Sequence, residues 1–283
     1  MSWTLILRRR GQQEEGLQNL QRAVELDPRN FFTLQQIAGS YGYLQRYSEE
    51  LALLDRALSI KPDDVETKVA RALIALDWKA DTRPLHQTLD EIRAKDPEAI
   101  KTVADNWLLC TLAERDAAAA ESALVALGDN YFGNNAIRLR RTFGEGLIAR
   151  MMGNQAKARA AFTAARAEQQ KIVDSQPDYG PALCVLALMD AALGRKEEAL
   201  REGQRAIELL PVEKDSINGA HMIKYFAITA AWVGEKDLAC DRVAEAVRLP
   251  GQMSYGQLKL LPFWDPLRGD PRFEKIVASL APK

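Results

Sequence analysis

Apolar residues recur along the chain in steps of three and four positions, within stretches that are separated by short polar turns. Residues 181–193 are almost entirely apolar, Gly194 and Arg195 form a predicted turn, and residues 197–210 carry apolar residues on one face only. Steps of three and four place side chains on one face of an α-helix. The pattern therefore predicts pairs of antiparallel helices, each pair burying the apolar faces of its two members.

A short motif closes several of these helix pairs. Residues 22–28 read RAVELDP, residues 56–62 read RALSIKP and residues 205–211 read RAIELLP. Pro28 and Pro62 lie 34 residues apart, which is the period of helix–turn–helix units that stack into a solenoid. Each unit of a solenoid contacts mainly its neighbours, so we expect one continuous array rather than two globular domains.

The packing positions of these units resemble those of the tetratricopeptide repeat (TPR) family. The matching residues are Gly11, Leu20, Ala23 and Pro28 in the first unit, and Ile37, Ala38, Tyr41, Leu54, Ala57 and Pro62 in the second. The resemblance implies an all-α fold, a right-handed α-solenoid of about seven TPR-like helix–turn–helix units with a C-terminal capping helix. In this register Met1 falls inside the first helix of its unit. We therefore expect a truncated first unit, and interpret the chain as part of something longer or as one whose start is poorly chosen.

One cluster of turn-forming residues interrupts the helical pattern. Residues 128–135 read GDNYFGNN, and we predict a kink at 128–136 between N-terminal repeats (1–127) and C-terminal repeats (137–283). The last segment, 254–283, is predicted to cap the solenoid. In it Asp265 and Asp270 each precede a proline, which is typical of a helix N-cap followed by the first helical residue.

The C-terminal third carries a second, narrower resemblance. Residues 201–283 resemble the TPR region of large bacterial regulators, which carry a serine/threonine kinase, a nucleotide cyclase or a winged-helix domain, often with a TolB-like segment, ahead of the repeats. The matching runs are residues 205–215, 234–237, 254–259 and 264–273. The resemblance implies a regulatory setting and supplies no enzymatic residues.

The composition mainly excludes certain kinds of partner and a membrane-spanning helix. The chain has 38 basic and 39 acidic residues and a net charge of −1, so its overall charge gives no reason to expect nucleic acid or an anionic membrane as partner. No stretch reaches the roughly 18 uninterrupted apolar residues of a membrane-spanning helix. Localisation stays open: the cytoplasm is slightly favoured, and an extracytoplasmic location requires an upstream membrane anchor.

The residue types that carry catalysis or bind metals are scattered. Cys110, Cys184 and Cys240 each lie inside an apolar helical pattern and are predicted to be buried core residues. His86 and His221 belong to different units, and neither has a partner at metal-ligand spacing. We therefore predict no enzyme, no cofactor and no metal site.

Two further features have structural interpretations. The glycines at 144 and 146 lie inside a predicted helix rather than after a strand, so they are interpreted as close helix contacts and not as a phosphate loop. Acidic pairs such as Glu49 and Glu50 stand at the start of a second helix, where negative charge is favoured by the helix dipole.

In TPR arrays the first helix of each unit lines a concave groove, and this register gives the candidate ligand-binding positions. The candidate peptide groove consists of basic and aromatic residues: Arg140, Phe143, Arg150, His221, Lys224 and Trp232. Arginine forks bind carboxylates and aromatic rings pack apolar side chains, so an acidic peptide fits this set. In the alternative interpretation, Phe143 and Trp232 are interhelical core and the charges form a solvated face.

These observations favour a protein–protein interaction module, the C-terminal regulatory or sensory part of a larger bacterial signalling protein that binds a protein or peptide in its concave groove. The alternative is a stand-alone structural scaffold or assembly factor. The sequence leaves open the identity of the partner, the upstream domain and the oligomeric state.

Overall fold

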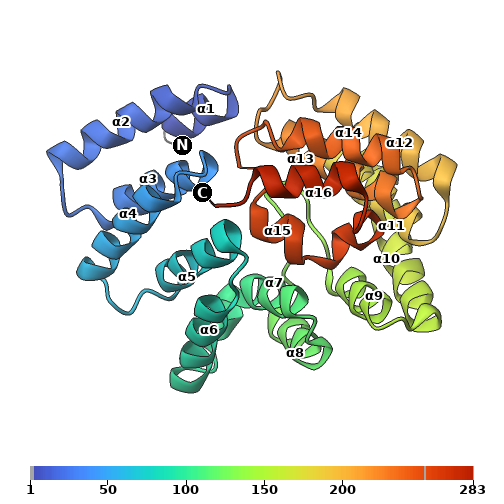
Figure 1. The fold of residues 1–283 in the computed structure, drawn as a ribbon, viewed down its shortest axis with the longest axis horizontal. Coiled ribbons are helices and arrows are strands. Elements are labelled where there is room, and N and C mark those ends of the chain that lie inside the picture. The colour runs from blue at the N-terminus through green and yellow to red at the C-terminus, as the bar shows by residue number, and fades with distance from the viewer. Residues whose placement is uncertain (1–2, 252, 283) are drawn as a thin grey trace.

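The computed structural model describes residues 3–251 and 253–282, and these form helices that follow one another in antiparallel pairs (Figure 1). The helices of the first four units are α1 (Trp3–Arg9), α2 (Gln13–Leu26), α3 (Phe31–Tyr43), α4 (Tyr47–Ile60), α5 (Val65–Lys79), α6 (Arg83–Lys95), the 3-10 helix η1 (Ala99–Val103), α7 (Ala104–Glu114) and α8 (Ala117–Leu127). Those of the remaining chain are α9 (Arg141–Met151), α10 (Gln155–Ser175), α11 (Gly180–Ala192), α12 (Lys196–Leu209), α13 (Asn218–Trp232), α14 (Lys236–Ala246), α15 (Tyr255–Leu260), the 3-10 helix η2 (Pro262–Leu267) and α16 (Pro271–Ser279). The predicted all-α, TPR-like solenoid is confirmed.

Local sequence signals explain where helices begin and turn. The side chains of Asn30 and Asp64 each accept a hydrogen bond from a backbone N–H three residues on, at the starts of α3 and α5, and such caps stabilise a helix start. The turns inside three units place a glycine at positive φ: Gly153, Gly194 and Gly234. Only glycine adopts this conformation without steric cost, so these positions stop the first helix and reverse the chain.

The glycines of α9 are contact positions, as predicted. A Cβ on Gly146 would lie 2.6 Å from the ring of Phe162, and one on Gly144 would lie 2.6 Å from the side chain of Leu124. The small residues let α9 approach its neighbours α10 and α8 at close range.

The irregular segment extends past the predicted kink at 128–136, as far as residue 140. Helix α9 begins only at Arg141, and Phe132 and Leu139 exchange two backbone hydrogen bonds of 3.0 and 2.8 Å as an isolated antiparallel bridge. Ile137 and Leu139 are buried while Arg138 between them is exposed. That alternation belongs to extended chain rather than to a helix, and it explains why α9 begins only at Arg141.

The capping segment departs from expectation at one of its two Asp-Pro pairs. Asp270 caps α16 through a hydrogen bond from the Arg272 N–H. Asp265 was predicted to cap a helix in the same way, but it lies inside η2 with Pro266. Its carboxylate instead accepts two hydrogen bonds, of 2.7 and 2.6 Å, from the guanidinium of Arg115 at the end of α7.

The C-terminal segment does more than seal the end of the solenoid. Helix α16 packs against α14, whereas α15 packs against α5 and α7, and η2 packs against α13. Figure 1 shows α15 between the cyan and orange parts of the chain, on the inner side of the curved array. We call residues 253–267 the inner segment, because they occupy the concave side that the repeats enclose.

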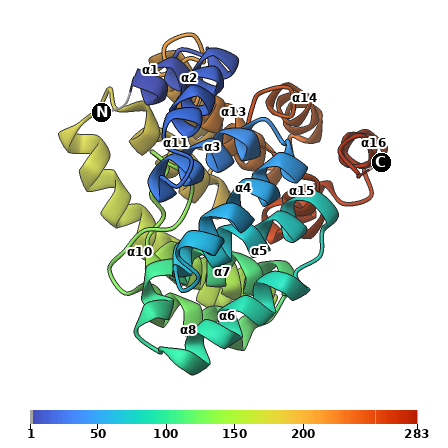
Figure 2. The same ribbon diagram turned by 90° about the vertical axis from the view of Figure 1, so that its left-hand side faces the viewer.

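The two ends of the array also meet. The backbone N–H of Ser216 donates to the carbonyl of Arg9 at 2.8 Å, and the Ser216 hydroxyl donates to the carbonyl of Arg8 at 2.7 Å. Arg9 further pairs with Asp215. Figures 1 and 2 both show the blue N-terminal helices beside the orange helix α13, so the solenoid curls until its first unit touches its last.

The apolar core is unevenly shared between the units. One continuous cluster of buried residues runs from Val69 to Val277, while α2 to α5 hold two small clusters of their own around Leu17 and Leu54. All three cysteines are buried and free, as expected. The division into two groups of repeats on either side of 128–136 stays a prediction. No helix among residues 3–251 and 253–282 is long and apolar enough to cross a membrane.

Candidate functional site

The predicted groove residues Phe143 and Trp232 form an aromatic cluster inside the protein. Their rings stack with centroids 6.3 Å apart and an interplanar angle of 5°, and Phe162 and Phe263 pack against the pair. The indole N–H of Trp232 donates to the backbone carbonyl of Phe263 at 2.9 Å. Phe263 belongs to the inner segment, so the chain itself covers these rings. Phe143 and Trp232 therefore lie in the interhelical core, as the alternative interpretation expected.

The two predicted arginines lie in different surroundings. The guanidinium of Arg150 stands 4.1 Å from the ring centroid of Trp232, a cation–π contact at the edge of the aromatic cluster. Arg140 lies just before α9 and donates a hydrogen bond of 2.9 Å to the hydroxyl of Tyr131. The structure thus brings Phe143, Arg150 and Trp232 together and leaves Arg140 apart from them.

His221 is a buried residue of α13. Its Nδ1 lies 2.7 Å from the carbonyl oxygen of Ile217 and donates to it. Burial, together with the nearby Lys224 ammonium, lowers the pKa of His221 to about 4, so the ring is neutral at physiological pH. Phe143, His221 and Trp232 are all buried, and Phe263 of the inner segment covers Trp232. Of the predicted groove residues, Arg150 and the edge of Trp232 line an open cleft of about 390 Å³ beside the end of α11.

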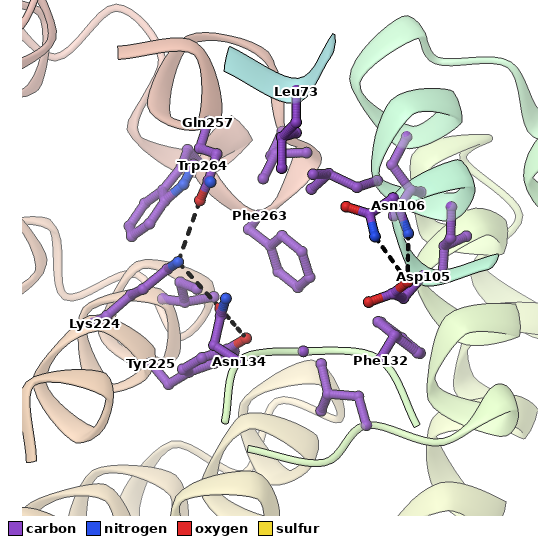
Figure 3. Close-up of a pocket in the computed structure, with 17 residues that line it drawn as sticks. Leu73, Asp105, Asn106, Phe132, Asn134, Lys224, Tyr225, Gln257, Phe263 and Trp264 are labelled. Atoms are coloured by element: carbon purple, nitrogen blue, oxygen red, sulfur yellow. Dashed lines mark hydrogen bonds between the residues drawn. The ribbon is translucent and has the colours of Figure 1, made fainter. Parts of the chain in front are cut away.

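The concave side holds a cavity of about 180 Å³ between α7, α13, residues 132–134 and the inner segment. Its walls are mostly apolar side chains: Leu73, Leu108, Leu109, Leu112, Phe132, Leu139, Tyr225, Ile228, Leu261, Phe263 and Trp264. The polar groups at the wall are Asp105, Asn106, Asn134, Lys224 and Gln257. Figure 3 shows Phe263 at the centre of the view, with Lys224 on one side and Asp105 on the other.

Lys224 is the predicted groove residue that reaches this cavity. Its ammonium donates to the side-chain oxygens of Asn134 and Gln257, each at 3.3 Å (Figure 3). Only 7% of the residue is exposed. Burial lowers the pKa of Lys224 to about 8, opposed by the attraction of Asp77. At pH 7 the amine is therefore mainly charged, and it has neutral acceptors but no carboxylate within hydrogen-bonding distance among the described residues.

An open cleft of about 530 Å³ adjoins the cavity and shares three wall residues with it: Asp105, Phe132 and Gly133. Tyr131 lines the cleft and is 40% exposed. The guanidinium groups of Arg138 and Arg140 lie 5.4 and 4.9 Å from its ring centroid. We call Tyr131, Arg138 and Arg140 the arginine–tyrosine rim.

The arginines of the rim are not occupied by carboxylates in the part of the chain that the structure describes. Neither Arg138 nor Arg140 makes an ion pair with a carboxylate of the described residues, although many surface arginines of the chain do, for example Arg83 with Asp81. The cleft also contains Lys101, which is paired with Glu98 at 2.6 Å. Arg140 uses one N–H for the Tyr131 hydroxyl, and the remaining donors of the two guanidinium groups are available for an anion.

Most residues of this site could not be predicted from the sequence. The repeat register assigns positions only within helices, whereas Tyr131, Asn134 and Arg138 stand in the irregular segment, and Gln257 and Phe263 stand in the inner segment. The run 128–135 was recognised as a break in the helices. The signal that could have pointed further is its combination of two aromatic residues with the arginines that follow it.

The geometry allows one kind of binding. The cavity wall holds one ammonium, that of Lys224, and on the opposite side one carboxylate, that of Asp105. The space therefore accepts an apolar group whose negative charge lies on the Lys224 side. The rim at the adjoining cleft accepts further carboxylates or phosphates through its guanidinium groups. Together the two spaces fit an extended ligand with an apolar anchor and acidic flanks.

No protein-family model matches the chain, and no curated protein sequence matches it at a significant level. Solved structures are similar in fold. A tetratricopeptide repeat protein from Parabacteroides merdae ATCC 43184 superposes with a TM-score of 0.54 at 12% identity, covering 97% of this chain and 94% of that one. Human IFIT1, as a dimer with m7Gppp-AAAA, gives a TM-score of 0.55 at 17% identity, covering 96% of this chain and 68% of that one. At these identities the likeness establishes the fold alone.

Proposed function

We propose that this chain is a protein-interaction module that binds a partner segment with one apolar anchor side chain and acidic residues beside it. The observation that carries the proposal is the cavity at Lys224, together with the adjoining cleft and its unpaired arginines. The anchor enters the cavity, and the acidic residues lie across the arginine–tyrosine rim. This keeps the acidic partner expected from the sequence and moves its site from the helical groove to the irregular segment.

The size of the cavity supports a single side chain as the anchor. At about 180 Å³ it is larger than the roughly 150 Å³ engineered cavity that binds benzene. Burying a phenylalanine or leucine side chain contributes about 1.5–3 kcal/mol. A longer apolar stretch has no room here, because the inner segment holds the rest of the concave side.

The charges supply the second half of the recognition. A carboxylate beside the anchor favours the charged form of Lys224, whose amine now has only neutral acceptors. Arg138 and Arg140 can each bind a carboxylate with two parallel hydrogen bonds. Ion pairs at an exposed surface are worth about 0.2–1 kcal/mol each, and several of them together let the rim distinguish acidic partners from basic ones.

The wider setting of the module is also a proposal. The resemblance of residues 201–283 to regulator TPR regions supports a place in a larger bacterial signalling protein. The contact between the first unit and residues 215–216 makes the array a closed body, which also suits the alternative, a stand-alone scaffold or assembly factor. An in-frame kinase, cyclase or DNA-binding domain in the upstream coding sequence distinguishes the first from the second.

The binding proposal is tested with a labelled peptide that carries one phenylalanine between glutamates, measured by fluorescence anisotropy on the full chain. We expect binding, and a loss of roughly tenfold or more in affinity when the phenylalanine is replaced by alanine or the glutamates by lysines. Leu73→Phe, which fills the cavity from a half-buried wall position, should weaken binding of the phenylalanine peptide to the level of the alanine peptide.

Charge reversal provides the second arm of the experiment. Arg138→Glu combined with Arg140→Glu should remove the preference for glutamates. Lys171→Glu combined with Arg201→Glu is the matched control, because it changes the net charge equally on α10 and α12, away from the cleft. If both double variants lower the affinity alike, the attraction is non-specific and the rim is not the site. The RNA-like compound PPP-AAAA, found with human IFIT1, serves as a competing probe, and preferential binding of it would contradict a protein partner.

A further inference from the structure

We propose that His86, Cys110 and Glu114 form a binding site for a transition-metal ion of the Zn²⁺ class between α6 and α7. None of these residues lines the Lys224 cavity or its cleft, so the inference is independent of the proposed function. It also revises the expectation from sequence that no metal site exists.

The site is assembled from two helical pairs that face each other. His86 and Asp90 stand four residues apart on α6, and Cys110 and Glu114 stand four residues apart on α7. Residues at this spacing lie on one face of a helix, so each helix presents two donors in the same direction. The imidazole Nδ1 of His86 lies 2.8 Å from Oε2 of Glu114. The donor atoms of His86, Cys110 and Glu114 all lie within 4.8 Å of one another.

The donor set matches the ion. Imidazole nitrogen, thiolate sulfur and carboxylate oxygen are the three protein ligand types of Zn²⁺, at about 2.0–2.3 Å from the metal. Around a tetrahedral ion such donors stand about 3.3–3.6 Å apart, so small side-chain rotations suffice to close the present arrangement on a metal. Three protein ligands leave a fourth position for water or for a ligand from a partner.

Asp90 has the role of an outer partner. Its Oδ2 lies 3.3 Å from the Nε2 of His86, the ring nitrogen that does not face Glu114. Metal-bound imidazoles commonly donate their second N–H to a carboxylate, which fixes the ring and raises its basicity. Asp90 is itself held by a hydrogen bond of 2.8 Å from Arg93. If His86 and Glu114 formed only an ion pair, neither the contact of Asp90 with the Nε2 of His86 nor the Cys110 thiol beside the pair would be needed.

The three donors are unequally exposed, so the site is accessible from one side. The side chain of His86 is 50% exposed and that of Glu114 is 20% exposed, while Cys110 is only 1% exposed. An ion therefore enters past the imidazole and meets the thiol at the bottom. Among residues 3–251 and 253–282, no other group of histidine, cysteine and acidic side chains comes as close together.

The test is titration of the tag-free full chain with Co²⁺ and with Zn²⁺. Co²⁺ should bind with one equivalent and show a thiolate-to-metal absorption band in the near ultraviolet, and Zn²⁺ should displace it. Cys110→Ala should abolish the band, while Cys240→Ala, which removes another buried free cysteine, should leave it unchanged. Asp90→Asn should weaken Zn²⁺ binding by about 10–100-fold, and His86→Ala by more, because it removes a direct ligand.

Stoichiometric Co²⁺ binding without a thiolate band would overturn the proposal, and so would a band that persists in Cys110→Ala. Circular dichroism of each variant separates loss of the site from loss of the fold. His86 is half exposed, so His86→Ala retains the fold and tests the site even if Cys110→Ala does not. Unchanged Zn²⁺ affinity in His86→Ala would equally reject the site.

Discussion

The two ends of the array follow the same helical repeat but bury their inner faces differently. In the N-terminal helices α2 to α4 the core consists of small clusters, and Leu26 and Phe32 are 82% and 64% exposed. In the C-terminal helices α9 to α14, Phe143 is fully buried and Trp232 is nearly so. What differs is whether another part of the chain returns to cover the face: the inner segment packs against α5, α7 and α13.

This difference shows that exposure in a solenoid is not decided by the repeat alone. A repeat contacts chiefly its neighbours, yet Arg115 binds Asp265 and Ser216 binds Arg9 across long separations in sequence. Such contacts turn an open array into a partly filled ring. Where another segment of the same chain packs on the surface that a TPR register assigns to a ligand, the residues of that surface become part of the core.

The largest expected effect comes from removing the anchor of the inner segment. Trp264 is 1% exposed and stacks on Phe273 of α16 with ring centroids 6.1 Å apart. Trp264→Ala should lower the free energy of unfolding by about 3–5 kcal/mol, the range for large-to-small changes at buried aromatic residues. Urea denaturation followed by circular dichroism measures the change.

Phe32→Ala is the matching change at the N-terminal end. The side chain is largely exposed, so the free energy of unfolding should change by no more than about 0.5 kcal/mol. Equal losses in the two variants would mean that the two ends are equally well packed, contrary to the comparison.

The helices themselves could be predicted, because their apolar spacing and turn glycines act locally. Gly194 and Gly234 end their helices where the pattern places them. The candidate site could not be predicted to the same degree. Lys224 was recognised from the register, but Asn134 and Gln257, which hold its amine, lie outside any register and reach it only through the tertiary fold. Long-range contacts of this kind leave no periodic signal in one sequence.

The second prediction concerns the contact of α15 with α5. A Cβ on Gly256 would lie 1.7 Å from the carbonyl oxygen of Leu76, whereas a Cβ on Gly39 in α3 would meet nothing within 4 Å. Gly256→Ala should therefore force α15 away from α5 and cost about 1–3 kcal/mol, as overpacking does. Gly39→Ala should stabilise the chain by about 0.5–1 kcal/mol, because alanine is the better helix residue.

Gly256→Ala and Gly39→Ala are thus expected to change the stability in opposite directions, which tests the difference between covered and uncovered faces. Limited proteolysis provides a second measurement, since a displaced α15 exposes the chain between α14 and α15. Faster cleavage there in Gly256→Ala, with Gly39→Ala unchanged, is the expected pattern. A stable Gly256→Ala variant with native proteolysis would show that the inner segment is not tightly fixed to α5.

The remaining expected effect is electrostatic and lies where the N-terminal units meet the inner segment. Glu50 was predicted to favour the helix dipole at the start of α4, but it lines a pocket that also contains Asp77 and Ser254. Burial, together with the negative charge of Asp77, raises the pKa of Glu50 to about 8. Between pH about 4.5 and about 8 the folded chain therefore keeps a proton that the unfolded chain has released. Stability consequently falls as the pH rises through this window.

Glu50→Gln keeps this position neutral at every pH, so the variant should gain stability relative to the parent chain as the pH rises from about 4.5 to about 8, and no further above it. Glu49→Gln is the matched control on the next residue. Its carboxylate is hydrogen-bonded by Arg46, which lowers the pKa of Glu49, so this variant should lose stability relative to the parent above the ordinary carboxyl range. Thermal unfolding of the three chains across pH 4 to 9 measures both slopes. Parallel curves for the two variants would show that Glu50 is solvated, and that the inner segment leaves the N-terminal units uncovered at this contact as well.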